Sequence, residues 1–174
     1  RSLKAYVETT LPELKIPNVP IMTFTQWLNQ LVGDVVGERP RGVMQKSQDL
    51  DRFKSSALCL RLLHRYLENR VSANPGTPDF VQELFGFFTF LTKQEVLWLR
   101  WDAVKQQLQE QVTKKLCDAS DDPILLHLVY AEHGYYPTKS PKSLGLCDHL
   151  VIDEAQDFGA MEIRALLNAV DRDR

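Results

Sequence analysis

The sequence lacks long apolar runs, and this absence excludes one class of protein at the outset. No hydrophobic stretch reaches the ~20 residues that a helix needs to cross a bilayer. The chain also does not open with the basic and apolar regions of a secretory signal peptide. We therefore expect no membrane partner, and we expect a cytoplasmic protein.

Cysteine is scarce as well, with 3 residues among 174. Cys59, Cys117 and Cys147 are too few and too scattered for the disulfide framework of a small secreted domain. Zinc needs four well-spaced ligands, and neither these cysteines nor the 4 histidines offer such a pattern. No Ser-His or Cys-His pair stands at a spacing typical of nucleophilic catalysis. These counts disfavour a disulfide scaffold, a zinc site and a catalytic triad.

The chain has no large excess of charge of one sign, because 21 basic residues face 23 acidic ones. This balance excludes a wholly basic nucleic-acid binder but not a local patch. Residues 37–70 carry more basic than acidic side chains, and residues 148–174 carry more acidic than basic ones. Within the first region, Arg52, Arg61 and Arg65 would suit phosphate contacts with duplex DNA. A solvated helix face with pairing charges explains them equally well, so both interpretations stay open.

What the sequence has in abundance is helical periodicity. Apolar residues that recur every three or four positions predict amphipathic helices. The predicted ranges are 2–14, 24–36, 48–72, 79–91, 93–116, 124–132 and 161–170. The breaker run Asn74-Pro75-Gly76 and the Asp122-Pro123 pair separate some of these helices. We expect a mainly α protein.

Two short apolar runs depart from this pattern. Residues 19–24 and 149–152 each predict a short buried strand that is followed by a helix. Two strands so far apart predict an α/β sheet interrupted by a large helical insertion. We expect residues 1–30 and 146–174 to belong to the sheet core, and residues 31–145 to form the insertion.

An acidic pair, Asp153-Glu154, directly follows the second predicted strand. Open α/β sheets place ligands beyond the carboxyl ends of their strands. There an Asp can hold Mg²⁺, usually through water, while a neighbouring carboxylate positions or deprotonates the attacking water. An acidic first turn that stabilises the following helix is the alternative, and both roles can coexist. The pattern predicts a nucleoside-triphosphate site.

Residues Leu150-Val-Ile-Asp-Glu-Ala-Gln-Asp157 resemble motif II (Walker B) of the UvrD/Rep-like superfamily 1 DNA helicases. Residues 21–28, Ile-Met-Thr-Phe-Thr-Gln-Trp-Leu, resemble the family's motif Ib, with Thr25 where the family commonly has histidine. About 130 residues separate the two motifs, which leaves room for the helical insertion (subdomain 1B) of these helicases. The resemblance implies a remnant of a parallel P-loop NTPase core. Only motif II is sharp, because the middle of the chain matches by helical character and length alone.

The resemblance implies roles for the residues of the acidic motif. Asp153 would bind Mg²⁺, and Glu154 would be the catalytic base that acts on water. Gln156 would be a catalytic residue that senses the γ-phosphate of ATP. Asp157 would link the ATP site to the DNA-binding surface. The implied cofactors are Mg²⁺ and ATP.

The resemblance further implies an ATP-dependent DNA helicase or translocase that moves on single-stranded DNA and unwinds duplex DNA, as in DNA repair. Thr23 and Phe24 would lie near the single strand. A P-loop is missing, because the nearest candidate, Gly37-Glu-Arg-Pro-Arg-Gly42, is followed by Val-Met instead of Lys and a hydroxyl residue. We therefore expect half an active site in this chain, which would be inactive alone.

The ends of the chain indicate a piece of a longer polypeptide, because each lies in or beside a predicted helix. The two strands would then lack neighbours, and exposed strand edges invite self-association. A different class of function also remains open. The chain would in that case be a non-catalytic helical module that binds a protein or nucleic acid.

Overall fold

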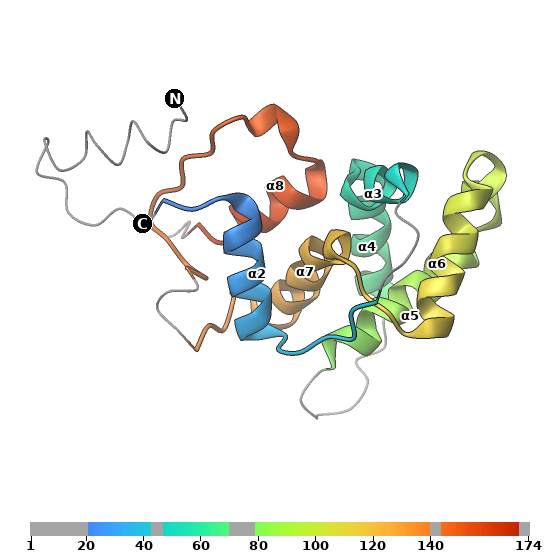
Figure 1. The fold of residues 1–174 in the computed structure, drawn as a ribbon, viewed down its shortest axis with the longest axis horizontal. Helices are drawn as coiled ribbons and strands as arrows, with labels where there is room; N and C mark the ends of the chain where they lie inside the picture. The colour runs from blue at the N-terminus through green and yellow to red at the C-terminus, as the bar shows by residue number, and fades with distance from the viewer. Residues whose placement is uncertain (1–20, 43–46, 70–78, 140–143, 171–174) are drawn as a thin grey trace, which may run out of the picture.

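The computed structural model describes residues 21–42, 47–69, 79–139 and 144–170, which form a mainly α-helical molecule, as predicted (Figure 1). The predicted helix at 2–14 lies outside these residues. The helices are α2 (Phe24–Val35), α3 (Gln48–Ser55), α4 (Ala57–Asn69), α5 (Phe80–Thr92), α6 (Asp102–Lys114), α7 (Asp122–His133) and α8 (Ala160–Leu167). Short 3₁₀ segments are η1 (Glu95–Arg100), η2 (Ala119–Asp121) and η4 (Ala155–Asp157). None of the described helices has the length and apolar character to cross a membrane.

Local capping explains where several helices begin and end. At α2 the Thr23 hydroxyl accepts from the Gln26 amide, while the Gln26 side chain accepts from the Thr23 amide. The Asp79 carboxylate accepts two backbone bonds at the start of α5. Helix α7 has Pro123 in its first turn and ends at Gly134, whose φ of 74° is left-handed.

The single helix predicted over 48–72 is wrong, because Ser56 divides it into α3 and α4. Ser56 has an extended backbone, with φ −74° and ψ 155°. Its hydroxyl donates to the Phe53 carbonyl at 2.7 Å and accepts from the Cys59 amide at 3.1 Å. A serine hydroxyl that satisfies the backbone locally competes with the helical hydrogen bond, so the helix ends and restarts here.

The single helix predicted over 93–116 is also wrong, because η1 and α6 replace it with a break at Trp101. Burial of aromatic rings accompanies this break. The Trp98 indole donates to the Leu91 carbonyl at 2.9 Å, and its ring lies 5.5 Å from that of Phe53. A straight helix would not place Trp98 in this buried position, so tertiary packing overrides the helical periodicity.

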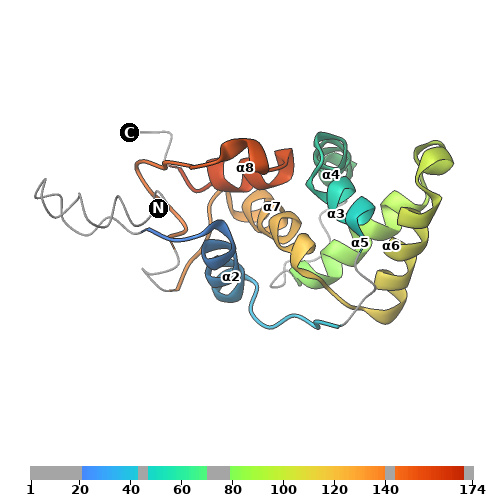
Figure 2. The same cartoon turned by 45° about the horizontal axis from the view of Figure 1, so that its top comes forward.

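Helix α7 lies at the centre of the molecule. Every residue from Asp122 to Val129 is buried, which is typical of a helix that is surrounded on all sides. Figures 1 and 2 show α2 on one side of α7 and α5 on the other, with α6 outside α5, while α8 packs against both α7 and α4. The predicted insertion and the two predicted core pieces therefore share one hydrophobic core.

The two predicted strands do not form within the described residues. Residues 21–23 and 149–152 are irregular, and Phe24 already belongs to α2. The β-bridges among the described residues are isolated pairs, Arg41 with Cys117 and Cys147 with Val170. A strand needs a neighbour to hydrogen-bond, and within the described residues no backbone hydrogen bond to another segment engages 149–152. Both segments lie at the same end of the molecule, beside α2 and α8 (Figure 1).

Candidate functional site

The acidic segment, defined here as Asp153–Asp157, forms an exposed turn that ends in η4. Asp153 accepts from the Glu154 amide at 3.1 Å, and the Asp157 amide donates to the Glu154 carbonyl at 2.9 Å. Glu154 has φ 53° and ψ 42°, a left-handed conformation that is unusual for a residue other than glycine. The Gln156 side-chain amide donates to the Glu154 carboxylate. The segment is thus a tight turn held by its own hydrogen bonds.

The four predicted site residues of this turn all have exposed side chains: Asp153, Glu154, Gln156 and Asp157. Within the part of the chain that the structure describes, none of them caps α8 by a hydrogen bond. Glu162 does so instead, because its carboxylate accepts from the Gly159 amide at 2.6 Å. The exposed carboxylates are therefore accessible to a ligand from solvent.

A cleft of about 720 Å³ lies beside this turn. Its walls include the N-terminal ends of α2, α3, α7 and α8. Three predicted site residues line it, namely Phe24, Arg52 and Asp157. Asp153 and Glu154 are outside this lining. The fold thus brings residues from three distant parts of the sequence to one cleft. The acidic pair Asp153-Glu154 does not belong to the cleft wall.

Direct contact joins the two motif-like regions. The rings of Phe24 and Phe158 lie 4.9 Å apart in a T-shaped arrangement, which is a favourable geometry for an aromatic pair. The Trp27 indole donates to the Leu144 carbonyl at 3.2 Å. The side chain of Thr23 is exposed and caps α2. These contacts place the start of α2 against the end of the acidic segment.

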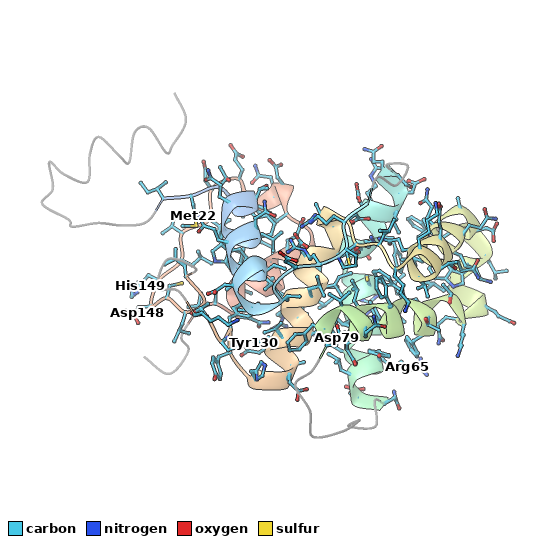
Figure 3. The ribbon with its side chains drawn as sticks, turned by 60° about the horizontal axis from the view of Figure 1, so that its bottom comes forward. Met22, Arg65, Asp79, Tyr130, Asp148 and His149 are labelled. Atoms are coloured by element: carbon cyan, nitrogen blue, oxygen red, sulfur yellow. The ribbon has the colours of Figure 1, made fainter. Side chains whose placement is uncertain are left out.

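The predicted DNA-binding arginines are not all near this cleft. Arg52 is exposed on α3, whereas Arg61 and Arg65 are exposed on α4. Figure 3 shows Arg65 on the opposite side of the molecule from Asp148 and His149, which precede the acidic segment. The structure therefore groups Arg52 with the cleft and separates Arg65 from it.

A buried charge network lies at the floor of the cleft, and sequence reasoning missed it. Lys54, counted in the sequence among the basic residues of 37–70, has a fully buried side chain. Its ammonium group lies 2.9 Å from Asp118 and 2.6 Å from Asp121. The Gln111 side-chain amide donates to both carboxylates, at 3.2 and 3.0 Å. Burial favours the neutral amine, but the charges of the two aspartates outweigh it and raise the pKa of Lys54.

A second ion cluster engages two further basic residues of the predicted basic patch, Arg39 and Arg41. The Asp122 carboxylate accepts from Arg39 at 2.6 Å and from Arg41 at 2.7 Å. The Cys117 amide donates to the Pro40 carbonyl at 2.8 Å, which ties the same loop to the residues that follow α6. These guanidinium groups bind a carboxylate of the protein, so the loop that most resembles a P-loop has a structural role. The only sequence signal for this ion cluster is the pair of arginines two residues apart.

No match to this chain was found among protein-family models, curated proteins or solved structures.

Proposed function

We propose that this chain is part of an ATP-driven DNA helicase or translocase, in which the acidic segment forms the Mg²⁺ and water side of the ATP site. One observation carries the proposal. An irregular apolar segment ends in two adjacent acidic residues, Asp153 and Glu154, whose side chains are exposed and accessible. Phosphoryl transfer needs mainly positioning and charge neutralisation, which such a pair supplies on one side of a triphosphate.

The exposure of the preceding apolar segment supports the idea of a missing sheet. Val151 is 89% exposed and Leu150 is 37% exposed, although the run containing them predicts a buried strand. An exposed apolar patch can mark a site of interaction with another segment. Residues 21–23 lie at the same end of the molecule as this apolar segment (Figure 2). We propose that the P-loop strand of a longer polypeptide pairs with them.

The residues of the turn fit Mg²⁺ that is shared with a nucleotide. Mg²⁺ usually takes one or two carboxylates and completes its shell with water and substrate phosphates. Among the described residues, no group of three or more acidic, histidine or cysteine side chains could hold a metal alone. A carboxylate pair of this kind therefore suits a metal bound jointly with ATP. When bound, Mg²⁺ would neutralise phosphate charge, and Asp153 would hold it.

Glu154 suits the role of general base. Its left-handed backbone costs roughly 1–2 kcal/mol, so the turn must hold it in place. The hydrogen bond from the Asp157 amide to the Glu154 carbonyl does so on the backbone. The Gln156 amide binds the carboxylate itself and thereby orients it. A carboxylate oriented in this way can accept the proton of an attacking water.

The cleft provides the DNA side of the proposal. Phe24 lines it and offers an aromatic face on which a base can stack, while Arg52 offers a charge for phosphate. Asp157 belongs both to the acidic segment and to the cleft wall, which suits a link between the two sites. Arg61 and Arg65 would contact the duplex at the junction, at a distance from the single strand.

The test is Glu154→Gln in the full-length protein. We expect ATP hydrolysis to fall by about 10³-fold or more, because the base is lost, while ATP binding stays within twofold. Glu95→Gln, at an exposed position in η1, is the matched control and should hydrolyse ATP normally. Hydrolysis is measured as phosphate release with and without single-stranded DNA. Normal turnover by Glu154→Gln would reject the assignment of the acidic segment to the ATP site.

A further inference from the structure

We infer that Gly159 is a positioning residue, and that its contact with Ser55 fixes the acidic segment to helix α3. The inference rests on the proposed function for its consequence in catalysis, but the contact itself can be tested without it. Gly159 comes two residues after Asp157, at the start of α8. Ser55 is the last residue of α3, in the predicted insertion.

The need for glycine at this position is steric and does not come from the backbone conformation. Gly159 has φ −77° and ψ 169°, which any residue can adopt. A Cβ atom at Gly159 would lie 2.4 Å from the Ser55 carbonyl oxygen and 2.6 Å from the Ser55 Cβ. Ser, Thr, Asp and Asn are the preferred residues at the start of a helix. Here they are excluded because the backbone of α3 approaches too closely.

The α3 side of this contact is firmly held. The neighbouring Lys54 is buried and paired with Asp118 and Asp121. On the other side, Ser56 binds both the Phe53 carbonyl and the Cys59 amide. The end of α3 therefore cannot move aside without breaking buried charge pairs or the start of α4.

The acidic side of the contact is held at few points. Phe158 touches Phe24, and the Gly159 amide donates to Glu162 at 2.6 Å. The contact with Ser55 adds a fixed point next to these. Because α3 also carries Arg52 at the cleft, the contact with Gly159 holds the acidic turn in a fixed position relative to the cleft wall. The contact thus fixes the turn that contains Asp153 and Glu154.

The first experiment measures hydrogen exchange of the Asp157 and Phe158 amides by NMR in the chain described here. Gly159→Ala should speed their exchange roughly threefold or more, since the new methyl group displaces the turn. Gly33→Ala is the control, because a Cβ there meets nothing within 4 Å. Ser55→Gly combined with Gly159→Ala should recover part of the protection. Should Gly159→Ala not fold, Ser55→Gly alone tests the contact and should change the same amides in the same direction.

The second experiment measures ATP hydrolysis by the same variants in the full-length protein. Gly159→Ala should lower kcat roughly tenfold or more with KM for ATP within twofold, because catalytic groups are misplaced while binding is retained. Partial recovery in the double variant is expected. Unchanged exchange in every variant would overturn the contact, and changed exchange with unchanged kcat would overturn its role in catalysis. A wild-type protein without ATPase activity would reject the proposed function, while the exchange result would still decide the contact.

Discussion

The surroundings of α7 and the segment 144–159 are built on opposite principles. Around α7, charged side chains are buried and neutralise one another, as Lys54 does with Asp121. In the segment 144–159, the acidic side chains are exposed and the apolar Val151 is 89% exposed. The segment is held by a few tethers, among them the bond from the Cys147 amide to the Ala169 carbonyl at 2.8 Å.

This difference separates stability from function within one chain. A charge that is paired inside the protein has little left to offer a ligand, whereas the carboxylates of Asp153 and Asp157 are exposed to solvent and accessible to one. The region around α7 therefore explains why the chain folds, and the acidic segment explains what it would do. The following predictions test this division, beginning with the largest effect.

Lys54→Met should be the most destabilising of these changes. It removes the partner of Asp121, which is fully buried, and leaves that carboxylate uncompensated. Loss of one member of a buried ion pair typically costs about 3–5 kcal/mol in the free energy of unfolding. Urea unfolding followed by circular dichroism measures the cost. The same substitution at the exposed Lys93 is the control and should change stability by less than about 0.5 kcal/mol. Equal effects at both positions would contradict the assigned role of the network.

A matched pair of leucine truncations compares the two regions directly. Leu125→Ala, in α7, should cost about 2–5 kcal/mol because it leaves a cavity in the core. Leu146→Ala should cost less than about 0.5 kcal/mol, since its side chain is 59% exposed. Chemical unfolding of both variants gives the two values. A large loss at Leu146 would show that the segment 144–159 is part of the stabilising core.

Acid should weaken the fold through His127. Burial, with a smaller contribution from His64 and Arg164, lowers the pKa of His127 from 6.5 to about 3 in the folded state. The unfolded chain therefore binds a proton between these values that the folded chain does not. Stability is full above pH 6.5 and falls by about 1.4 kcal/mol per pH unit as the pH drops toward 3.

The variant His127→Gln should lose this part of the pH dependence, which urea unfolding between pH 4 and 7 measures. His149→Gln changes an exposed histidine of the segment 144–159 and serves as the control. It should leave the dependence of the free energy of unfolding on pH as it is in the wild type. An unchanged slope in His127→Gln would show that other groups cause the acid sensitivity.

Val151→Lys should have the smallest effect on stability, within about 0.5 kcal/mol, because the side chain is exposed. Its effect on association should be larger. We propose that copies of this chain pair weakly through the apolar segment 149–152, and a charge on an edge opposes such pairing. Sedimentation equilibrium should then show less dimer for the variant than for the wild type. Thr113→Lys, an exposed change on α6, should leave association as it was.

The sequence predicted the helical class and most helix starts, because capping residues and apolar periodicity are local signals. The starts of α2 and α5 agree with the prediction to within a residue. Two long helices were predicted where the structure has breaks, at Ser56 and Trp101. In the first case a serine hydroxyl satisfies the backbone, and in the second the burial of Trp98 decides. Periodicity alone contains neither kind of information.

The candidate site divides in the same way. The acidic pair could be found from the sequence, because neighbouring carboxylates after an apolar run form a local pattern. The contact of Phe24 with Phe158 and that of Gly159 with Ser55 could not, since each joins residues about a hundred positions or more apart. The basic patch was overestimated, because Arg39 and Lys54 turn inward to partners that the sequence does not reveal.

By itself, the amino-acid sequence determined most of the helices and the order Asp153-Glu154-Ala-Gln-Asp157, because each depends on neighbours within a few residues. Tertiary structure alone decided which charges are available. Burial makes an unpaired charge costly, so the buried Lys54 and Arg39 pair with aspartates that folding brings to them. Among the described residues, no basic side chain forms an ion pair with the carboxylates of the acidic turn, and for that physical reason they remain exposed for chemistry.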